Sequence, residues 1–425
     1  MKKSTKALLL GGAAGAAAAA YIYQSKKSGQ SLNPLRRLFP VFTMPEPHGP
    51  YAIGTFEAHL TDPSRQESRR GTAPLGAGAR EVPVTVWYPA DPADAEAAGG
   101  PEHYPASLGE CMALVFGLPQ RLFGHLEQVA THTFRDIPLS AEDSAYPVLL
   151  FSPGIRSTRF QSLTLIEELV SRGYIVVGMD HPYTSARVQL ADGSEALYMH
   201  EPVFGQSHER YEYNVGEVAV RAKDARFVLD TLEAWNTAGS GHLLCGRMDL
   251  ERAGILGHSY GGATAAEVLG SDGRFAAALS LEGGFWSETP QKPLARPFMY
   301  LFTGGTQQSL DPKQPKKEKV FFEEWQEDAQ RVMRSGQSDR LFAVIEPFFH
   351  QSFTDVAFVS PRLFARQLTP ERTAEITSTY SAAFFDRYLK GIPSNLLGQD
   401  QPQFPEVRYD PALTRLQVQD EEAQR

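Results

Sequence analysis

Short apolar runs alternate with longer amphipathic stretches along most of this chain. Five runs have the length and composition of strands that are buried on both faces, and two longer stretches carry apolar residues at helical spacing. This alternation predicts an α/β fold with a mostly parallel sheet and helices on both faces. The expected strands lie at 146–151, 173–179, 253–256, 275–281 and 297–302, and the expected helices at 162–172 and 215–234.

Three regions add to this alternation. Residues 57–61 and 82–88 indicate two further strands near the start of the chain. Residues 104–136 mix apolar and polar positions at helical spacing, which predicts one or two helices in a cap-like insertion. Residues 306–341 form a second, charged insertion.

The expected strand at 253–256 leads into Gly257-His258-Ser259-Tyr260-Gly261, and an alanine-rich helix follows. A G-x-S-x-G motif between a strand and a helix is typical of the nucleophile elbow of an α/β-hydrolase. The sharp turn exposes the serine hydroxyl and needs flanking residues without side chains. The motif therefore predicts the α/β-hydrolase fold, with Ser259 as the catalytic nucleophile.

A serine nucleophile needs a histidine base and an acid that orients that base, and in this fold both follow the serine in the chain. His350 is the single histidine beyond Ser259, so we expect it to be the base. Glu282 directly follows an expected strand and is the first choice for the acid; otherwise it is a surface cap. The other candidate carboxylates are Asp311, Glu346 and Asp355.

The oxyanion hole of this fold needs two backbone amides. One is expected to be the N–H of Tyr260, directly after the nucleophile. The other should come from the loop after the strand at 146–151, in which Pro153 has no N–H to offer. Ile155 is the first choice in that loop and Gly154 is the second.

Composition and charge limit the kinds of partner and cofactor that this protein is expected to bind. The 425 residues carry a net charge of −9 with a pI near 5.7, which argues against nucleic acid as the main partner. The two cysteines, Cys111 and Cys245, lie in apolar surroundings and are expected to be buried free thiols. No cysteine–histidine cluster has the spacing of a zinc site, so the sequence indicates no metal.

The first 24 residues carry a targeting signal. Basic residues flank an apolar stretch at 7–23, which meets the lower length limit of about 17 residues for a membrane span. We favour an uncleaved anchor, and the alternative is a secretory signal peptide cleaved near Ala18-Ala19-Ala20. The protein is thus expected to be membrane-anchored or exported. We expect a linker at 25–47, a catalytic domain at 48–410 and a polar tail at 411–425.

With these residues in place, the chain resembles the platelet-activating factor acetylhydrolase family, the plasma or type II lipase-like group with its bacterial relatives. The family usually has Asp where this chain has Glu282, and several members have His where it has Pro153. The similar segments are Gly49-Pro-Tyr-Ala-Ile-Gly54, Val86-Trp-Tyr-Pro89, Phe151-Ser-Pro-Gly154, Asp180-His-Pro182, Gly257-His-Ser-Tyr-Gly-Gly262 and His350-Gln-Ser-Phe-Thr-Asp355.

The resemblance implies hydrolysis of short-chain or acetyl sn-2 esters of phospholipids, with no metal or organic cofactor and with a membrane surface as a partner. The residues by themselves reach only as far as a serine ester hydrolase, because a fold does not fix the substrate. A general carboxylesterase or polyester hydrolase is the alternative within this class. A non-catalytic hydrolase fold that binds other molecules is the alternative outside it.

Further side chains have two interpretations each. Phe285 and Trp286 follow the acid and either wall the acyl pocket or pack in the core. A basic, aromatic stretch at 313–325 either rests on a lipid surface or, as its interspersed glutamates favour, is a solvated helix. His181 is expected to be structural, and His258 to pack against or orient the elbow.

Overall fold

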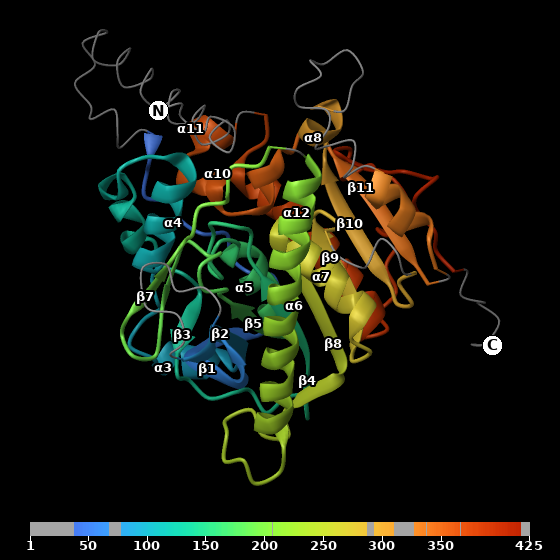
Figure 1. The fold of residues 1–425 in the computed structure, drawn as a ribbon. Coiled ribbons are helices and arrows are strands. Elements are labelled where there is room, and N and C mark those ends of the chain that lie inside the picture. Colours follow the sequence, from blue (N-terminus) through green and yellow to red (C-terminus); the bar gives the residue numbers. More distant parts are fainter. Residues whose placement is uncertain are drawn as a thin grey trace, which may run out of the picture.

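The computed structural model describes residues 38–67, 78–205, 207–286, 293–309, 327–336, 338–365 and 367–417. Within these ranges ten strands form one sheet, in the order β12-β11-β10-β9-β8-β4-β5-β2-β1-β3 (Figure 1). From β11 to β5 each strand is parallel to the next one in this order. β12 is antiparallel to β11, β2 is antiparallel to both β5 and β1, and β3 pairs in parallel with β1. The predicted mostly parallel sheet is confirmed.

The sheet strands are β1 Ala52–Gln66, β2 Ala79–Ala90, β3 Thr133–Arg135, β4 Tyr146–Ser152, β5 Ile175–Met179, β8 Met248–His258, β9 Phe275–Leu281, β10 Phe298–Thr303, β11 Arg340–Ile345 and β12 Val407–Tyr409. A separate two-stranded ribbon consists of β6 Arg187–Gln189 and β7 Glu195–Leu197. The helices are α3 Pro92–Ala97, α4 Ala106–Phe116, α5 Leu163–Ser171, α6 Ser207–Asn236, α7 Tyr260–Ser271, α8 Gly304–Ser309, α10 Val356–Val359, α11 Pro361–Phe364 and α12 Pro370–Leu389, with 3₁₀ turns η1 Gln120–Leu122, η2 Gly124–Gln128 and η4 His350–Phe353.

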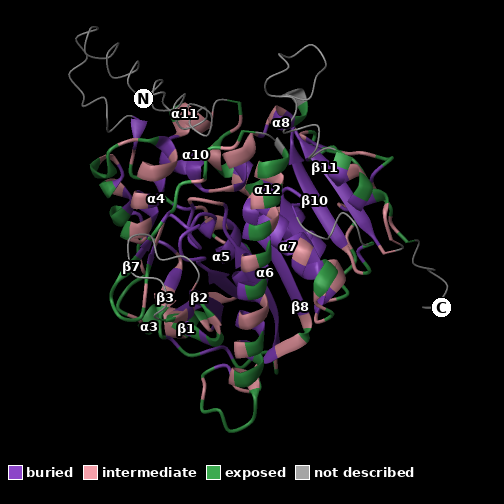
Figure 2. Cartoon of the chain, in the orientation of Figure 1, coloured by how far each residue is buried: buried purple, intermediate pink, exposed green. Residues whose placement is uncertain are grey.

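Two hydrophobic cores lie on the two faces of the sheet. Successive residues of β8 show the division, because Leu256 belongs to the core under α5 and α12, whereas Ile255 belongs to the core under α6 and α7. Figure 2 shows the central strands buried between these helices, with the outer side of α6 exposed. A sheet covered on both faces explains why its strands are continuous apolar runs.

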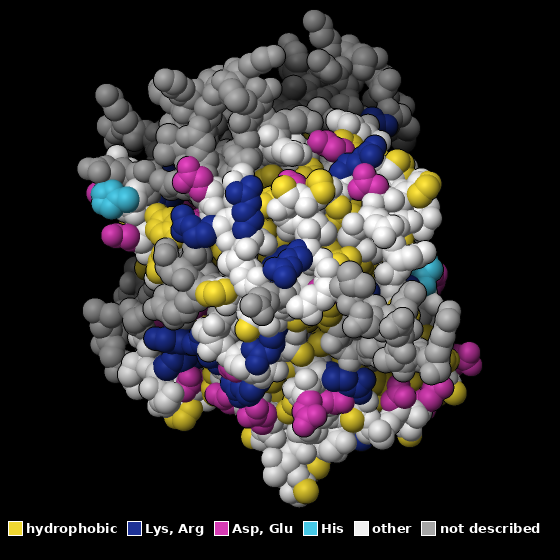
Figure 3. Space-filling view, turned by 90° about the vertical axis from the view of Figure 1, so that its right-hand side faces the viewer, with side chains coloured by type: hydrophobic (Ala, Val, Ile, Leu, Met, Phe, Trp, Pro, Cys, Tyr) yellow, Lys and Arg dark blue, Asp and Glu magenta, His cyan; other side chains and the backbone are white. Residues whose placement is uncertain are grey.

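The surface carries both signs of charge. On the face shown in Figure 3, Lys and Arg side chains are intermixed with Asp and Glu side chains among the described residues. The net charge of −9 is therefore not concentrated in one acidic field on this face.

The folded domain begins earlier than its predicted boundary at residue 48. Leu38, Phe39 and Met44, which fall in the predicted linker 25–47, are buried in the core on the α5 and α12 side. The Phe39 ring packs edge-on against Phe123, with 5.1 Å between the ring centroids. Residues 38–47 thus form part of the domain.

The domain also extends beyond residue 410 into the predicted tail 411–425. Arg415 and Arg340 exchange backbone N–H···O bonds of 2.7 and 2.8 Å, and the Leu413 side chain is buried. The predicted anchor at 7–23 and the stretch at 313–325 lie outside the described residues. None of the helices in the described ranges has both the length and the apolar character that a membrane crossing requires.

Substitutions in residues 38–41 test the earlier domain boundary. Leu38→Ala should lower the free energy of unfolding by about 2–5 kcal/mol, because it removes a fully buried side chain. Val41→Ala, three residues away and half-exposed, should change it by less than about 0.5 kcal/mol. Urea unfolding of both variants measures the difference, and equal effects would restore the linker interpretation.

Candidate active site

Ser259 occupies a strained turn between the end of β8 and the start of α7. Its backbone has φ 58° and ψ −120°, a conformation that non-glycine residues rarely adopt and that persists only where the surroundings enforce it. The Ser259 N–H donates to Leu281 O at 3.0 Å, which fixes the turn to the end of β9. A Cβ on Gly261 would lie 1.8 Å from Ser152 O, so this position needs glycine.

His350 and Glu282 meet from different parts of the chain. His350 begins the η4 turn after β11, and its Nδ1–H donates to Glu282 Oε2 at 2.8 Å. Glu282 follows β9 with φ 53° and is completely buried. Its other oxygen accepts from the Thr303 N–H at 3.1 Å and the Thr303 hydroxyl at 2.5 Å. The carboxylate is therefore held in place, and because it bonds Nδ1, Nε2 is the ring nitrogen that would act as the expected base.

The other described carboxylates have different partners. Asp355 accepts from the Tyr104 hydroxyl at 2.7 Å and the Thr164 hydroxyl at 2.5 Å, and burial raises its pKa to about 6. The Glu346 carboxylate lies against the backbone of Gly304. Asp311 lies outside the described residues.

His258 holds the loop that carries His350. Its Nε2–H donates to the His350 carbonyl oxygen at 2.7 Å, and the centroids of the two rings are 4.6 Å apart. Burial, together with the nearby His350, places the pKa of His258 well below its usual value, so the ring is neutral. The expected orienting role of His258 thus has a concrete form, since the ring connects the elbow to the histidine loop.

The loop after β4 presents Ile155 between two amides that are already bonded. The Gly154 N–H donates to Gln161 Oε1 at 3.0 Å, and the Arg156 N–H donates to Thr184 O at 2.8 Å. Ile155 lies between them and lines the same cavity as Ser259. Among the candidate amides of this loop, the geometry therefore favours Ile155 over Gly154.

Arg221 of α6 contacts both sides of the expected oxyanion hole. Its buried guanidinium donates to Pro153 O at 2.7 Å and to the Thr184 hydroxyl at 3.0 Å. The same group lies 5.4 Å from the centroid of the Tyr260 ring. Sequence reasoning missed this residue. The signal that could have found it is a set of charged residues at helical spacing on α6, where Glu217 and Asp224 are also buried.

Under the oxyanion loop lies a second, fully buried chain of a serine, a histidine and an aspartate. The Ser152 hydroxyl donates to His181 Nε2 at 2.9 Å, and His181 Nδ1–H donates to Asp224 at 2.8 Å. Arg80 adds an ion pair of 2.7 Å to Asp224. Because His181 and Asp224 are inaccessible, the chain is structural, as expected for His181. Burial lowers the pKa of His181 to about 4.

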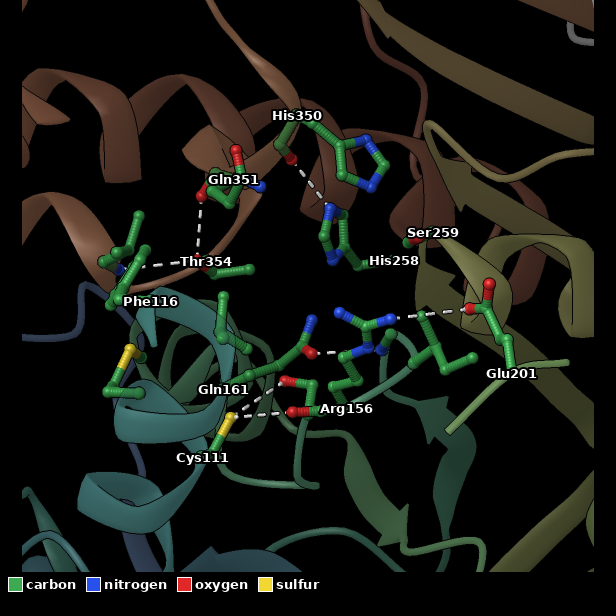
Figure 4. A pocket seen from close by; sticks show the side chains of 16 residues that line it. Cys111, Phe116, Arg156, Gln161, Glu201, His258, Ser259, His350, Gln351 and Thr354 are labelled. Atoms are coloured by element: carbon green, nitrogen blue, oxygen red, sulfur yellow. Dashed lines mark hydrogen bonds and ion pairs between the residues drawn. The ribbon is translucent and has the colours of Figure 1, made fainter. Parts of the chain in front are cut away.

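Ser259 and His350 open into a cavity of about 250 Å³. In Figure 4, Phe116 and Cys111 lie on one side of this cavity and Glu201 lies on the other. The apolar end is lined by Met112, Val115, Phe116 and Val356, and the polar end by Arg156, Gln161 and Glu201. The predicted insertion thus provides a wall of the site through α4.

The two aromatic residues that follow Glu282 and the two cysteines take no part in the predicted chemistry. Phe285 packs in the core against Tyr300, and Trp286 packs against the Tyr260 ring with 4.9 Å between centroids. Cys111 and Cys245 are free thiols, but only Cys111 is buried. Burial raises the pKa of Cys111 to about 12, so its thiol is not a nucleophile near neutral pH.

The fold and this site define the class of the protein as an α/β-hydrolase with the equipment of a serine ester hydrolase. The family described as "Platelet-activating factor acetylhydrolase, isoform II" matches residues 38–390, and the chain belongs to that family.

Relatives of known name agree with the family assignment. The chain is 21% identical over 383 residues to the platelet-activating factor acetylhydrolase of Gallus gallus, covering 82% of this chain and 84% of that protein. It is 28% identical over 281 residues to a probable 1-alkyl-2-acetylglycerophosphocholine esterase of Arthroderma benhamiae, covering 62% of this chain and 65% of the fungal protein. A solved structure of a ferulic acid esterase from Streptomyces cinnamoneus has a TM-score of 0.68 and 29% identity, over 87% of this chain and 99% of that one.

Two substitutions of Glu282 test the acid. Glu282→Gln should lower kcat for any ester by roughly 10⁴, because an amide no longer holds the imidazole in the right tautomer. Glu282→Asp should lower kcat less, since it keeps the charge but ends one methylene short of His350. Glu346→Gln is the matched control and should keep kcat within a few-fold. Steady-state hydrolysis of p-nitrophenyl acetate measures all three, and an equal loss in the control would refute the assignment.

The depressed pKa of His181 predicts a specific loss of stability in acid. Between about pH 6.5 and 4 the unfolded chain binds the proton that buried His181 refuses, so stability falls as the pH drops through this window. The contribution is on the order of 3 kcal/mol. In His181→Gln this part of the slope should vanish, while the contribution of His258, whose pKa burial also lowers, stays.

Unfolding free energies at several pH values measure the slope. His200→Gln, at an exposed position, is the control and should follow the wild-type slope. Parallel slopes for the wild-type protein and His181→Gln would contradict the prediction, whatever the difference in absolute stability.

Proposed function

We propose that this protein hydrolyses short-chain or acetyl sn-2 esters of phospholipids through an acyl-enzyme. The observation that carries the chemistry is the bond between His350 and the buried Glu282, in the cavity that Ser259 also lines. Family membership supports the substrate class, since named relatives are acetylhydrolases of platelet-activating factor or 1-alkyl-2-acetylglycerophosphocholine esterases.

In the first half-reaction, the Ser259 oxygen attacks the ester carbonyl while His350 Nε2 takes the hydroxyl proton. The imidazolium that forms is stabilised by the Glu282 carboxylate at Nδ1. The tetrahedral intermediate then collapses. Its C–O bond to the glycerol oxygen breaks, and His350 gives the proton to the leaving alcohol. The products of this step are a lysophospholipid and acyl-Ser259.

In the second half-reaction, water attacks the acyl group while His350 again takes a proton. Collapse of the second tetrahedral intermediate returns that proton to the Ser259 oxygen and releases the carboxylic acid. The amides of Tyr260 and Ile155 are the proposed donors to the oxyanion in both halves. Each donor is worth roughly 10²–10³ in kcat. No step of this sequence uses a cofactor.

The shape of the cavity fits a short acyl group. A volume of about 250 Å³ must hold the acyl chain together with the atoms around the ester. The α4 side chains Met112 and Phe116 line the apolar end. A long fatty acyl chain would have to displace them.

A broader ester hydrolase is the second candidate. The likeness to a ferulic acid esterase, which covers 87% of this chain, favours it as a specific alternative. A binding protein without activity is disfavoured, because Ser259, His350 and Glu282 are all present and the last two are bonded.

We also propose that residues 7–23 anchor the protein to a membrane, with export after cleavage as the alternative. The support is the apolar stretch itself, and an anchor would hold the catalytic domain near a phospholipid surface. The mass of the mature chain separates the two cases, and recovery of the intact chain in a salt-washed soluble fraction would overturn the anchor.

A substrate comparison tests the phospholipid assignment. A 1-alkyl-2-acetylglycerophosphocholine should be hydrolysed with a higher kcat/KM than its analogue with a long sn-2 chain. In Ser259→Ala, kcat for the acetyl substrate should fall by about 10⁶. Release of the lysophospholipid, which both phospholipid esters form, measures both, with p-nitrophenyl acetate as the reference ester. Turnover of p-nitrophenyl acetate without the phospholipid would leave a general esterase.

A further inference from the structure

Arg156 projects from the oxyanion loop into the polar end of the cavity. Its backbone has φ 61°, which is strained for a residue with a side chain, and it is fixed on both sides. The N–H donates to Thr184 O at 2.8 Å, and the carbonyl accepts from Cys111 Sγ at 3.3 Å. The loop therefore holds this side chain in one direction, and Figure 4 shows its guanidinium between Gln161 and Glu201.

The Arg156 guanidinium has N–H donors that make no hydrogen bond to the described residues. Its Nη2 lies 3.8 Å from Glu201 Oε1, which is a charge contact but too long for a hydrogen bond. Its carbon lies 5.0 Å from the centroid of the Tyr198 ring. The Nε atom is buried and has no hydrogen-bond partner among the described residues. An arginine carries five N–H donors in a planar fork, so this one can accept a further oxyanion ligand.

Gln161 offers another unused donor beside Arg156. Its Oε1 accepts from the Gly154 N–H, which fixes the orientation of the side-chain amide. The Nε2 group is thereby turned away from the loop, and it is buried with no hydrogen-bond partner in the described ranges. Two unsatisfied nitrogen donors thus line one end of a catalytic cavity, where burial without a partner is costly.

Glu201 adds the opposite charge at the same end. Its side chain and that of Arg156 are each 22% exposed, so both are partly removed from water. Both residues line the cavity that contains Ser259, on the side away from Phe116. A cation and an anion side by side are complementary to a ligand that carries an anion and a cation a few bonds apart.

We propose that Arg156 and Glu201 bind the zwitterionic headgroup of the substrate, with Arg156 on the phosphodiester and Glu201 on the ammonium. This inference rests on the proposed phospholipid substrate. The phosphodiester oxygens accept from the Arg156 fork and from Gln161 Nε2, which fills the donors that the free protein leaves unused. The ammonium then lies near the Glu201 carboxylate, whose negative charge attracts it.

Three acetyl esters with the same alkyl chain separate the two contacts. The first carries phosphocholine. The second carries phosphomethanol, which keeps the phosphodiester but not the ammonium-bearing end of choline. The third is the alkylacetylglycerol without a headgroup. The ratio of kcat/KM for phosphocholine over alkylacetylglycerol should fall at least about tenfold in Arg156→Gln. The ratio for phosphocholine over phosphomethanol should fall in Glu201→Gln by about fivefold or more.

Ratios of kcat/KM between substrates are insensitive to damage in the oxyanion loop, because a disturbed Ile155 amide would slow the hydrolysis of all three esters equally. Arg408→Gln, which removes an exposed ion pair with Asp400, is the matched control and should keep every ratio. Unchanged ratios in Arg156→Gln and Glu201→Gln would overturn the headgroup site while leaving the proposed function intact. A wild-type protein that cleaves the alkylacetylglycerol but not the phosphocholine ester would overturn both.

Discussion

The close approach of the first turn of α7 to the end of β4 is the contact on which the site depends. Gly261 lies so near the Ser152 carbonyl that no side chain fits between them. This approach places the nucleophile turn against the start of the oxyanion loop, so that Ser259 and Ile155 face one cavity. A bond from the Ser259 N–H to Leu281 O then brings the end of β9, and with it Glu282, into the same place.

Buried polar groups hold this arrangement from below. Arg221 bonds the Pro153 carbonyl, and the Ser152–His181–Asp224 chain continues the support to Arg80. Burying charged groups costs free energy unless each has partners. Networks of this kind therefore contribute little net stability to a fold. They lie beneath the loop whose Ile155 amide is the proposed oxyanion donor, and such a donor must be held in a precise position, which is a physical reason for a costly network here.

The residues proposed for catalysis could be picked from the sequence because their signals are local, and the structure places Ser259 and His350 on one cavity with Glu282 bonded to His350. The elbow motif identifies Ser259, the count of histidines identifies His350, and adjacency to a strand end identifies Glu282. The supporting residues were not predictable in the same way. Whether Arg221 points at the Pro153 carbonyl depends on how α6 is rotated on the sheet, which no short segment encodes.

The predicted elements follow the same rule. The strand predicted at 275–281 has the bounds of β9, because turn residues on both sides of an apolar run mark where the strand begins and ends. The long helix α12 was missed, although Thr369 and Pro370 carry a start signal and the Thr369 hydroxyl does accept from the Arg372 N–H at 3.1 Å. The burial of Phe39 could not be predicted from the local sequence, because this ring packs against Phe123, which is distant in the chain.

The wall formed by α4 has a consequence for how such a protein can diverge. This helix lies in the insertion before β4 and contributes Met112 and Phe116 to the cavity, whereas Ser259, Glu282 and His350 all come from later parts of the chain. Changes in α4 can therefore remodel the space for the acyl group without touching the reacting atoms. One scaffold can in this way give rise to proteins that share a reaction but accept different acyl groups.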